Sequence, residues 1–153
     1  MESFSPNLPL GTQRYSVDGN IPDDFLKGTT VLHVDDMEFF SVIAGKSVQA
    51  NNWVYTYVTS GEAALSLLEG KKTFDVIFLD INLGEGLNGY QTAKRILEIN
   101  PYQLIYSASS SEIDPQMRAL FKGNLGKIGG KKELFNALSG ELIKQRLTFL
   151  SRK

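Results

Sequence analysis

Residues 74–80 read Phe-Asp-Val-Ile-Phe-Leu-Asp, an apolar run that ends abruptly in the carboxylate of Asp80. The β-branched and aromatic residues of this run predict a buried strand, and a glycine-rich turn at residues 84–89 follows shortly after it. Asp80 therefore stands where a strand becomes a loop, which is where open α/β sheets bind their ligands. We predict that Asp80 is a nucleophile.

The composition bounds the possible functions. A chain of 153 residues suits one domain with a full core. The net charge of -1 gives no general attraction to nucleic acid or membrane, and the lack of cysteine excludes disulfides, thiolate metal sites and a cysteine nucleophile. No apolar stretch approaches the roughly 18 residues of a membrane span, and the N-terminus has no signal-peptide pattern. A soluble, cytoplasmic protein is expected.

Residues 1–28 contain scattered prolines, glycines and polar residues without any strand or helix period. We therefore predict an irregular N-terminal extension over residues 1–28 and one folded domain over residues 29–153. Near the end of the extension, residues 21–26 favour a short helical turn that packs Phe25 and Leu26 onto the domain.

From residue 29 onward, strand and helix patterns alternate. The predicted strands are residues 29–34, 54–58, 74–80, 104–106 and, more weakly, 124–126. The predicted helices begin near Met37, at the capping-box pattern of residues 59–62, after Gly89, at Asp114-Pro115 and near Lys132, the last running to about Leu150. His33, inside the first strand, is interpreted as a core histidine. Five strands alternating with five helices predict a doubly wound parallel sheet covered on both faces.

In such a sheet the carboxyl ends of the strands share one edge. The residues that follow strands one, three, four and five are therefore expected to converge there: Asp35, Asp36, Asp80, Ser107 and Lys127. Three neighbouring carboxylates resist ionising together unless a cation offsets them, and Mg²⁺ suits oxygen ligands. This set suits phosphoryl transfer, with Asp80 attacking phosphorus, Lys127 pairing with one phosphoryl oxygen and the Ser107 hydroxyl donating to another.

The order and spacing of these residues resemble the receiver domain of two-component response regulators. The resemblance extends over residues 29–150 and rests jointly on the acid pair Asp35-Asp36, Asp80, Ser107-Ala108 and Lys127. It implies a five-stranded, flavodoxin-like fold and a switch in the face made by the fourth helix, the fifth strand and the fifth helix.

The resemblance also implies the roles of the site residues. Asp80 would be phosphorylated in a Mg²⁺-dependent reaction by a sensor histidine kinase, with Ser107 and Lys127 as the other catalytic groups. The implied metal ligands are the carboxylates of Asp35, Asp36 and Asp80 and the backbone carbonyl of Asn82.

Several positions depart from the usual pattern of the family. Leu83-Gly84 replace the usual Met-Pro pair, and one inserted residue in the same loop favours greater mobility. Ile128 replaces the proline that usually follows the lysine, and this favours a different orientation of the Lys127 side chain. Asn124 stands where the family often has an aromatic switch residue.

We expect a stand-alone receiver, because the chain ends at Lys153 just after the closing helix. Its phosphoryl group would come from a sensor histidine kinase or a histidine phosphotransfer protein, and it would signal through a downstream protein target or a phosphorelay. A homodimer is possible. Nucleic-acid partners, membrane partners and an independent enzymatic activity are not expected.

Three alternatives remain open at the level of sequence. The first is a degenerate receiver that binds partners without phosphorylation, suggested by Asn124, Ile128 and the inserted loop. The second is a hydrolase of the haloacid dehalogenase type, which needs a second aspartate where Asn82 stands. The third is a flavin carrier, whose phosphate would be repelled by Asp35 and Asp36.

Overall fold

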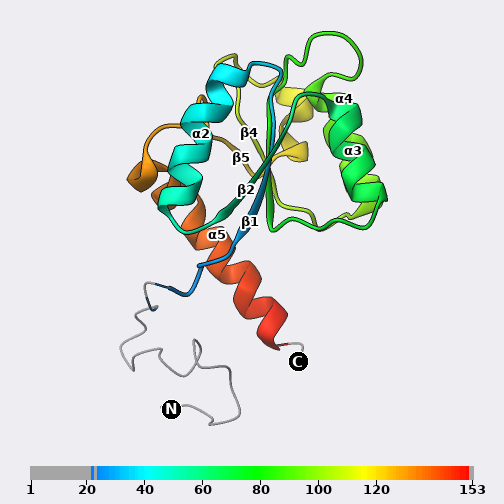
Figure 1. Ribbon diagram of the computed structural model, residues 1–153. Coiled ribbons are helices and arrows are strands. Elements are labelled where there is room, and N and C mark those ends of the chain that lie inside the picture. Colours follow the sequence, from blue (N-terminus) through cyan, green and yellow to red (C-terminus); the bar gives the residue numbers. More distant parts are fainter. Residues whose placement is uncertain (1–21, 23, 152–153) are drawn as a thin grey trace.

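The computed structural model describes residue 22 and residues 24–151 of the chain (Figure 1). These residues contain a five-stranded parallel sheet with the strand order β2-β1-β3-β4-β5. The strands are β1 (Thr30–Val34), β2 (Val54–Val58), β3 (Val76–Leu79), β4 (Ile105–Ser107) and β5 (Gly123–Asn124). The helices are α2 (Glu38–Ala50), α3 (Gly61–Glu69), α4 (Gly89–Ile99), the 3-10 helix η1 (Pro115–Leu120) and α5 (Lys131–Ser151). The predicted doubly wound, flavodoxin-like sheet is confirmed.

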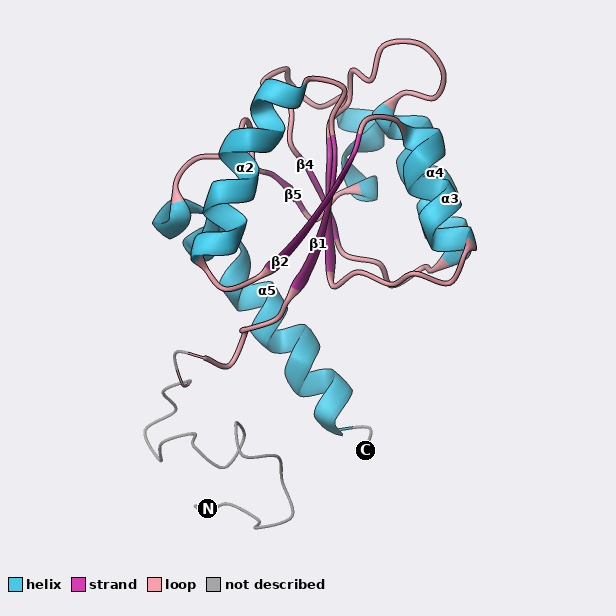
Figure 2. Cartoon of the chain, viewed as in Figure 1, coloured by secondary structure: helices cyan, strands magenta, loops and turns pink. Residues whose placement is uncertain are grey.

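Helices cover both faces of the sheet: α2 and α5 lie on one face, and α3 and α4 lie on the other (Figures 1 and 2). Successive strand residues point to opposite faces. In β3, Val76 and Phe78 therefore pack in the core under α2 and α5, whereas Ile77 and Leu79 pack in the core under α3 and α4. All four residues are fully buried, so β3 is the central element that joins the two cores.

Side-chain caps fix where α3 and α4 begin. The Ser60 hydroxyl caps α3, one residue later than the predicted capping box implied. Glu62 does not complete that box, because its carboxylate turns to the loop between β3 and α4. A reciprocal capping box is present instead at α4, between Asn88 and Gln91.

The end of the sheet differs from the prediction. The six-residue 3-10 helix η1 replaces the predicted fourth α-helix, as suits a short segment that opens with Pro115. The last strand is Gly123–Asn124 rather than residues 124–126. The strand cannot continue because Gly126 has a φ of 63°, a left-handed conformation that breaks the extended backbone.

The closing helix α5 is 21 residues long and buries Leu134, Leu138 and Leu142 along one face. This periodicity is the one predicted from the sequence. Neither α5 nor any other helix of the described residues has the length and apolar character needed to cross a membrane.

The segment before β1 joins the packed domain. Phe25 and Leu26 are buried in the core on the α5 side, and Arg146 donates to the Phe25 carbonyl oxygen at 2.9 Å. The packed part of the chain thus includes residues ahead of the boundary predicted at residue 29. The rest of the predicted extension, residues 1–21 and 23, lies outside the described residues.

Gly89, the first residue of α4, packs tightly against the backbone that follows β3. A β-carbon at Gly89 would lie 2.6 Å from Ile81 Cα. Because this contact is with backbone, we expect Gly89→Ala to lower the free energy of unfolding by roughly 2 kcal/mol. Urea unfolding monitored by circular dichroism measures the change.

Gly140→Ala is the matched control, since Gly140 lies in α5 with nothing within 4 Å of an added β-carbon. This variant should be more stable by about 0.5–1 kcal/mol, because alanine favours helix more than glycine does. Equal midpoints for the two variants would contradict the packing described for Gly89.

Candidate functional site

The carboxyl edge of the two central strands brings three carboxylates together. β1 and β3 pair in register up to Val34 and Leu79, and the Asp80 N–H donates to the Val34 carbonyl oxygen at 2.9 Å. Asp35 and Asp80 therefore come directly after the paired ends of two adjacent strands, so they lie side by side at one edge of the sheet. Asp36 is the next residue after Asp35. One carboxylate oxygen from each of the three residues lies within 4.8 Å of the others.

Asp35 lies at the base of this cluster and is fully buried. Its Oδ1 accepts a hydrogen bond from the Met37 N–H at 2.9 Å, and its Oδ2 lies 3.3 Å from Lys127 Nζ. The Tyr57 hydroxyl donates to the Asp35 carbonyl oxygen at 2.7 Å. Both the side chain and the backbone carbonyl of Asp35 are thus held by hydrogen bonds just before α2 begins. Asp36, by contrast, is exposed.

The Asp80 carboxyl is also almost buried, with 5% of the residue exposed. Burial raises the pKa of Asp80 above its ordinary value, and the charge of Asp35 raises it further. Lys127 and the backbone N–H groups of Ile81 and Asn82 act in the opposite direction. The pKa nevertheless stays raised, so the cluster resists carrying its full negative charge without a further cation.

Lys127 is the cation of this cluster. Its Nζ donates to the Ala108 carbonyl oxygen at 3.2 Å and lies 3.8 Å from Asp80 Oδ1, compared with 3.3 Å from Asp35 Oδ2. The Phe40 ring lies under the ammonium, with its centroid 4.2 Å from Nζ, in a cation–π contact. Lys127 is therefore held closer to Asp35 than to Asp80.

Ser107 ends β4, beside Leu79 of β3, and is fully buried. Its hydroxyl donates to Asn124 Oδ1 at 2.9 Å and lies 3.4 Å from the Gly123 carbonyl oxygen, both in β5. The Asn124 carboxamide oxygen also accepts from the Gly126 N–H at 3.1 Å. The Ser107 hydroxyl, which was predicted to donate to the phosphoryl group, thus donates to the neighbouring strand β5 in this structure.

Asn82 lies near the start of the loop that connects β3 to α4 at this edge of the sheet. Its backbone N–H donates a hydrogen bond to the Asp80 carboxylate. Farther along the loop, the Leu87 N–H donates to Glu62 Oε2 at 2.8 Å, which ties the loop to α3. A metal contact by the Asn82 carbonyl stays a prediction.

Two residues of the site were not identified from the sequence. His33 is buried, as interpreted, but its Nε2 also lies 3.8 Å from Asp35 Oδ2. The signal was available, because residues two apart in a strand point to the same face. Phe40 had no such signal, since its contact with Lys127 joins two segments that are distant in the sequence.

The donor set fits a divalent cation. Three carboxylates face one ammonium group, which leaves two negative charges that one divalent cation would neutralise. Mg²⁺ prefers oxygen ligands such as carboxylates and commonly retains several of its waters. Because Asp36 is exposed, such waters could reach the ion from that side of the site. Asp35, Asp36 and Asp80 would hold the ion.

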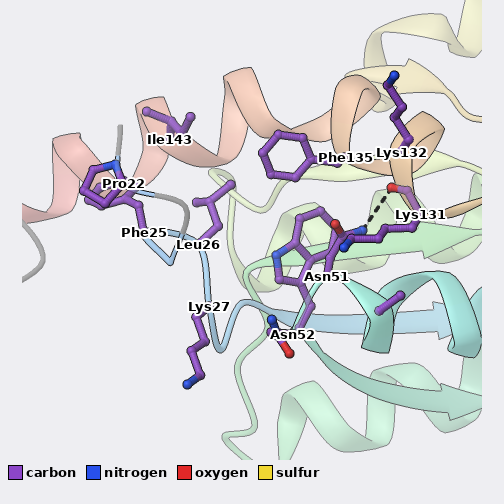
Figure 3. A pocket seen from close by; sticks show the side chains of 12 residues that line it. Pro22, Phe25, Leu26, Lys27, Asn51, Asn52, Lys131, Lys132, Phe135 and Ile143 are labelled. Atoms are coloured by element: carbon purple, nitrogen blue, oxygen red, sulfur yellow. Dashed lines mark hydrogen bonds between the residues drawn. The ribbon is translucent and has the colours of Figure 1, made fainter. Parts of the chain in front are cut away.

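A cavity of about 760 Å³ lies at the opposite end of the sheet, where β1 and β2 begin (Figure 3). Its rings and aliphatic groups come from the segment before β1, from Trp53 just before β2 and from α5, and three lysines also line it. The lining residues that Figure 3 labels include Phe25, Leu26, Phe135, Lys27, Lys131 and Lys132. No lining residue of this cavity belongs to the acidic cluster.

Comparison with known proteins gives the family. A family model described as the response regulator receiver domain matches residues 31–137. The transcriptional regulatory protein ComA of Bacillus subtilis is 29% identical over 79 residues, which cover 46% of this chain and 37% of ComA. Histidine kinase 2 of Arabidopsis thaliana is 27% identical over 96 residues, which cover 63% of this chain and 8% of that protein. This chain therefore spans a minor part of each relative.

A solved structure supports the same assignment at the level of the fold. The chemotaxis response regulator CheY4 of Vibrio cholerae superposes with a TM-score of 0.62 at 22% identity, over 74% of this chain and 98% of that one. The family model covers well over half of the chain and includes the acidic cluster and Lys127. The chain belongs to the response regulator receiver domain family of two-component systems.

Proposed function

We propose that this receiver domain accepts a phosphoryl group on Asp80 from a phosphohistidine. The observation that carries the proposal is the position of the Asp80 carboxylate, within 4.8 Å of Asp35 and Asp36 and 3.8 Å from Lys127. The donor would be a sensor histidine kinase or a histidine phosphotransfer protein, since both present a phosphorylated imidazole.

In the proposed reaction an oxygen of the ionised Asp80 carboxylate attacks phosphorus. A bond between this oxygen and phosphorus forms, the bond between phosphorus and the donor's imidazole nitrogen breaks, and the imidazole leaves with the electron pair. Lys127 pairs with a phosphoryl oxygen as negative charge accumulates there. Mg²⁺ bound by the three carboxylates would supply further neutralisation of that charge.

Two resting contacts would have to change during this reaction. Lys127, which lies nearer to Asp35, would move toward the phosphoryl group on Asp80. Ser107 would exchange its acceptor, from Asn124 Oδ1 to a phosphoryl oxygen. The exchange would release a carboxamide on the edge strand β5, and we propose that this change is what a partner protein detects.

The setting of the reaction is part of the same proposal. We infer a cytoplasmic protein that passes its signal to a downstream protein target or onward through a phosphorelay. A stand-alone receiver is compatible with either output, and a homodimer is one form in which the switched surface could act.

A degenerate receiver is the second candidate. It is favoured by one observation, that Ser107 donates to Asn124 and that Lys127 lies nearer to Asp35 than to Asp80. Such a protein would bind its partner without phosphorylation. Binding of Mg²⁺ and of beryllofluoride, which mimics a phosphoryl group on aspartate, separates the two candidates.

Asp80→Asn should abolish phosphorylation and leave the fold intact, because the amide is isosteric but not nucleophilic. Backbone amide NMR of the wild type should show Mg²⁺-dependent shifts near the three carboxylates and further shifts with beryllofluoride. In Asp80→Asn the beryllofluoride shifts should be lost. Phosphoryl transfer to Asp80→Asn would show that the nucleophile is wrong, and a wild type that binds neither ligand would favour the degenerate receiver.

The raised pKa of Asp80 predicts a pH-dependent stability difference in metal-free buffer. A raised folded-state pKa means that the ionised carboxyl opposes folding, and this cost disappears as the pH falls and the folded protein takes up a proton. Asp80→Asn should therefore be more stable than the wild type at neutral pH, and the difference should shrink toward about pH 4.

Urea unfolding at a series of pH values in EDTA measures this difference. Glu98→Gln, which removes an exposed carboxylate from α4, is the control and should behave like the wild type throughout. A difference between Asp80→Asn and the wild type that does not vary with pH would contradict the assigned cause.

The exchange of the Ser107 hydrogen bond predicts a specific NMR response. Saturating Mg²⁺ and beryllofluoride should shift the Asn124 side-chain amide signals of the wild type, because Ser107 then ceases to donate to that side chain. In Ser107→Ala the hydrogen bond is absent from the start, so the same signals should not respond. The exposed neighbour variant Ser110→Ala should respond as the wild type does.

A further inference from the structure

His33 carries a polar atom that the proposed chemistry leaves unused. The side chain lies in β1, with 1% of the residue exposed. Its Nε2 is the one buried side-chain nitrogen or oxygen of the described residues without a hydrogen-bond partner. A buried, unpaired polar atom costs free energy, and in native structures such atoms often mark a functional requirement. Asp35 Oδ2 lies 3.8 Å from this nitrogen.

The other ring nitrogen indicates which tautomer is present. His33 Nδ1 lies 2.7 Å from the Tyr55 hydroxyl. If that hydroxyl donates to Nδ1, the imidazole proton resides on Nε2 and points toward the Asp35 carboxylate. The opposite tautomer would set the Nε2 lone pair against a negative charge.

Neighbouring aromatic rings keep His33 in place. The ring centroids of Tyr55 and Tyr57 both lie 5.9 Å from that of His33, and the Phe78 centroid lies 6.1 Å away. Tyr57 also holds the backbone of Asp35 through its hydroxyl. The Nε2–H is therefore a donor held in place beside Asp35. Nε2 lies about 1 Å farther from Asp35 Oδ2 than the ordinary N–H···O hydrogen-bond distance of about 2.9 Å.

Asp35 Oδ2 is at present paired with Lys127 Nζ at 3.3 Å. In the proposed function, a phosphoryl group on Asp80 draws Lys127 away, so Asp35 Oδ2 loses its ammonium partner and Mg²⁺ is the one cation left beside it. We propose that His33 is a positioning residue that then donates its Nε2–H to Asp35 Oδ2. His33 keeps the Asp35 carboxylate oriented while Lys127 is engaged elsewhere. This inference rests on the proposed phosphorylation of Asp80.

NMR of the histidine ring tests the inference directly, because His33 is the single histidine of the chain. In the wild-type chain, ¹⁵N spectra of the imidazole should show the Nε2-protonated tautomer. Addition of Mg²⁺ and beryllofluoride should move the Nε2–H proton downfield, as expected for a new hydrogen bond to a carboxylate. Beryllofluoride binding without any change at Nε2–H would overturn the role of His33 alone. A wild type that binds no beryllofluoride would overturn the proposed function and this inference together.

Two substitutions separate hydrogen bonding from packing. His33→Gln keeps a side-chain N–H that reaches toward Asp35, whereas His33→Met keeps apolar bulk without a donor. His33→Met should bind beryllofluoride roughly tenfold more weakly than the wild type, the order expected for loss of one hydrogen bond to a charged group. His33→Gln should recover most of that loss.

Equal affinities for His33→Met and the wild type would overturn the inference. Amide spectra and melting temperatures of both variants report whether the fold is retained. If His33→Met does not fold, the Nε2–H shift of the wild type decides the question by itself.

Discussion

The mutual repulsion of Asp35, Asp36 and Asp80 is the constraint on which the rest of this site depends. The parallel register of β1 and β3 forces two of these carboxylates to the same level of the sheet, and both are buried. Their charges cannot be separated without unpairing the central strands. The protein therefore has to compensate the charge locally, through Lys127 and the backbone N–H groups that donate to Asp35 and Asp80.

Lys127 provides most of the compensation, and its position is determined by several segments. Its ammonium lies between Asp35 and Asp80 over the Phe40 ring, and the Ala108 carbonyl accepts one of its protons. A charge shared in this way can be redistributed when a new anion arrives, because no single contact holds it.

The loop that follows Lys127 connects this balance to α5. The Ser47 hydroxyl donates to the Gly129 carbonyl oxygen, and the Asn51 side chain donates to the Lys131 carbonyl oxygen at 3.1 Å. Residues 127–131 are therefore attached along α2 from the acidic cluster to the cavity at the far end of the sheet (Figure 3). The segment between Lys127 and the start of α5 is thus held at two points by Ser47 and Asn51.

The sequence alone determined the parallel sheet and the convergence of Asp35, Asp36 and Asp80, because strand and helix periods are local and parallel strands end at one edge. The limits of β5 and the 3-10 form of η1 escaped prediction, since a left-handed glycine and a short segment override weak propensities. Only the tertiary structure decided that Ser107 donates to Asn124, that Lys127 lies nearer to Asp35 and that His33 Nε2 faces a carboxylate. These contacts join side chains from different segments, and their choice of partner depends on packing that no local pattern records.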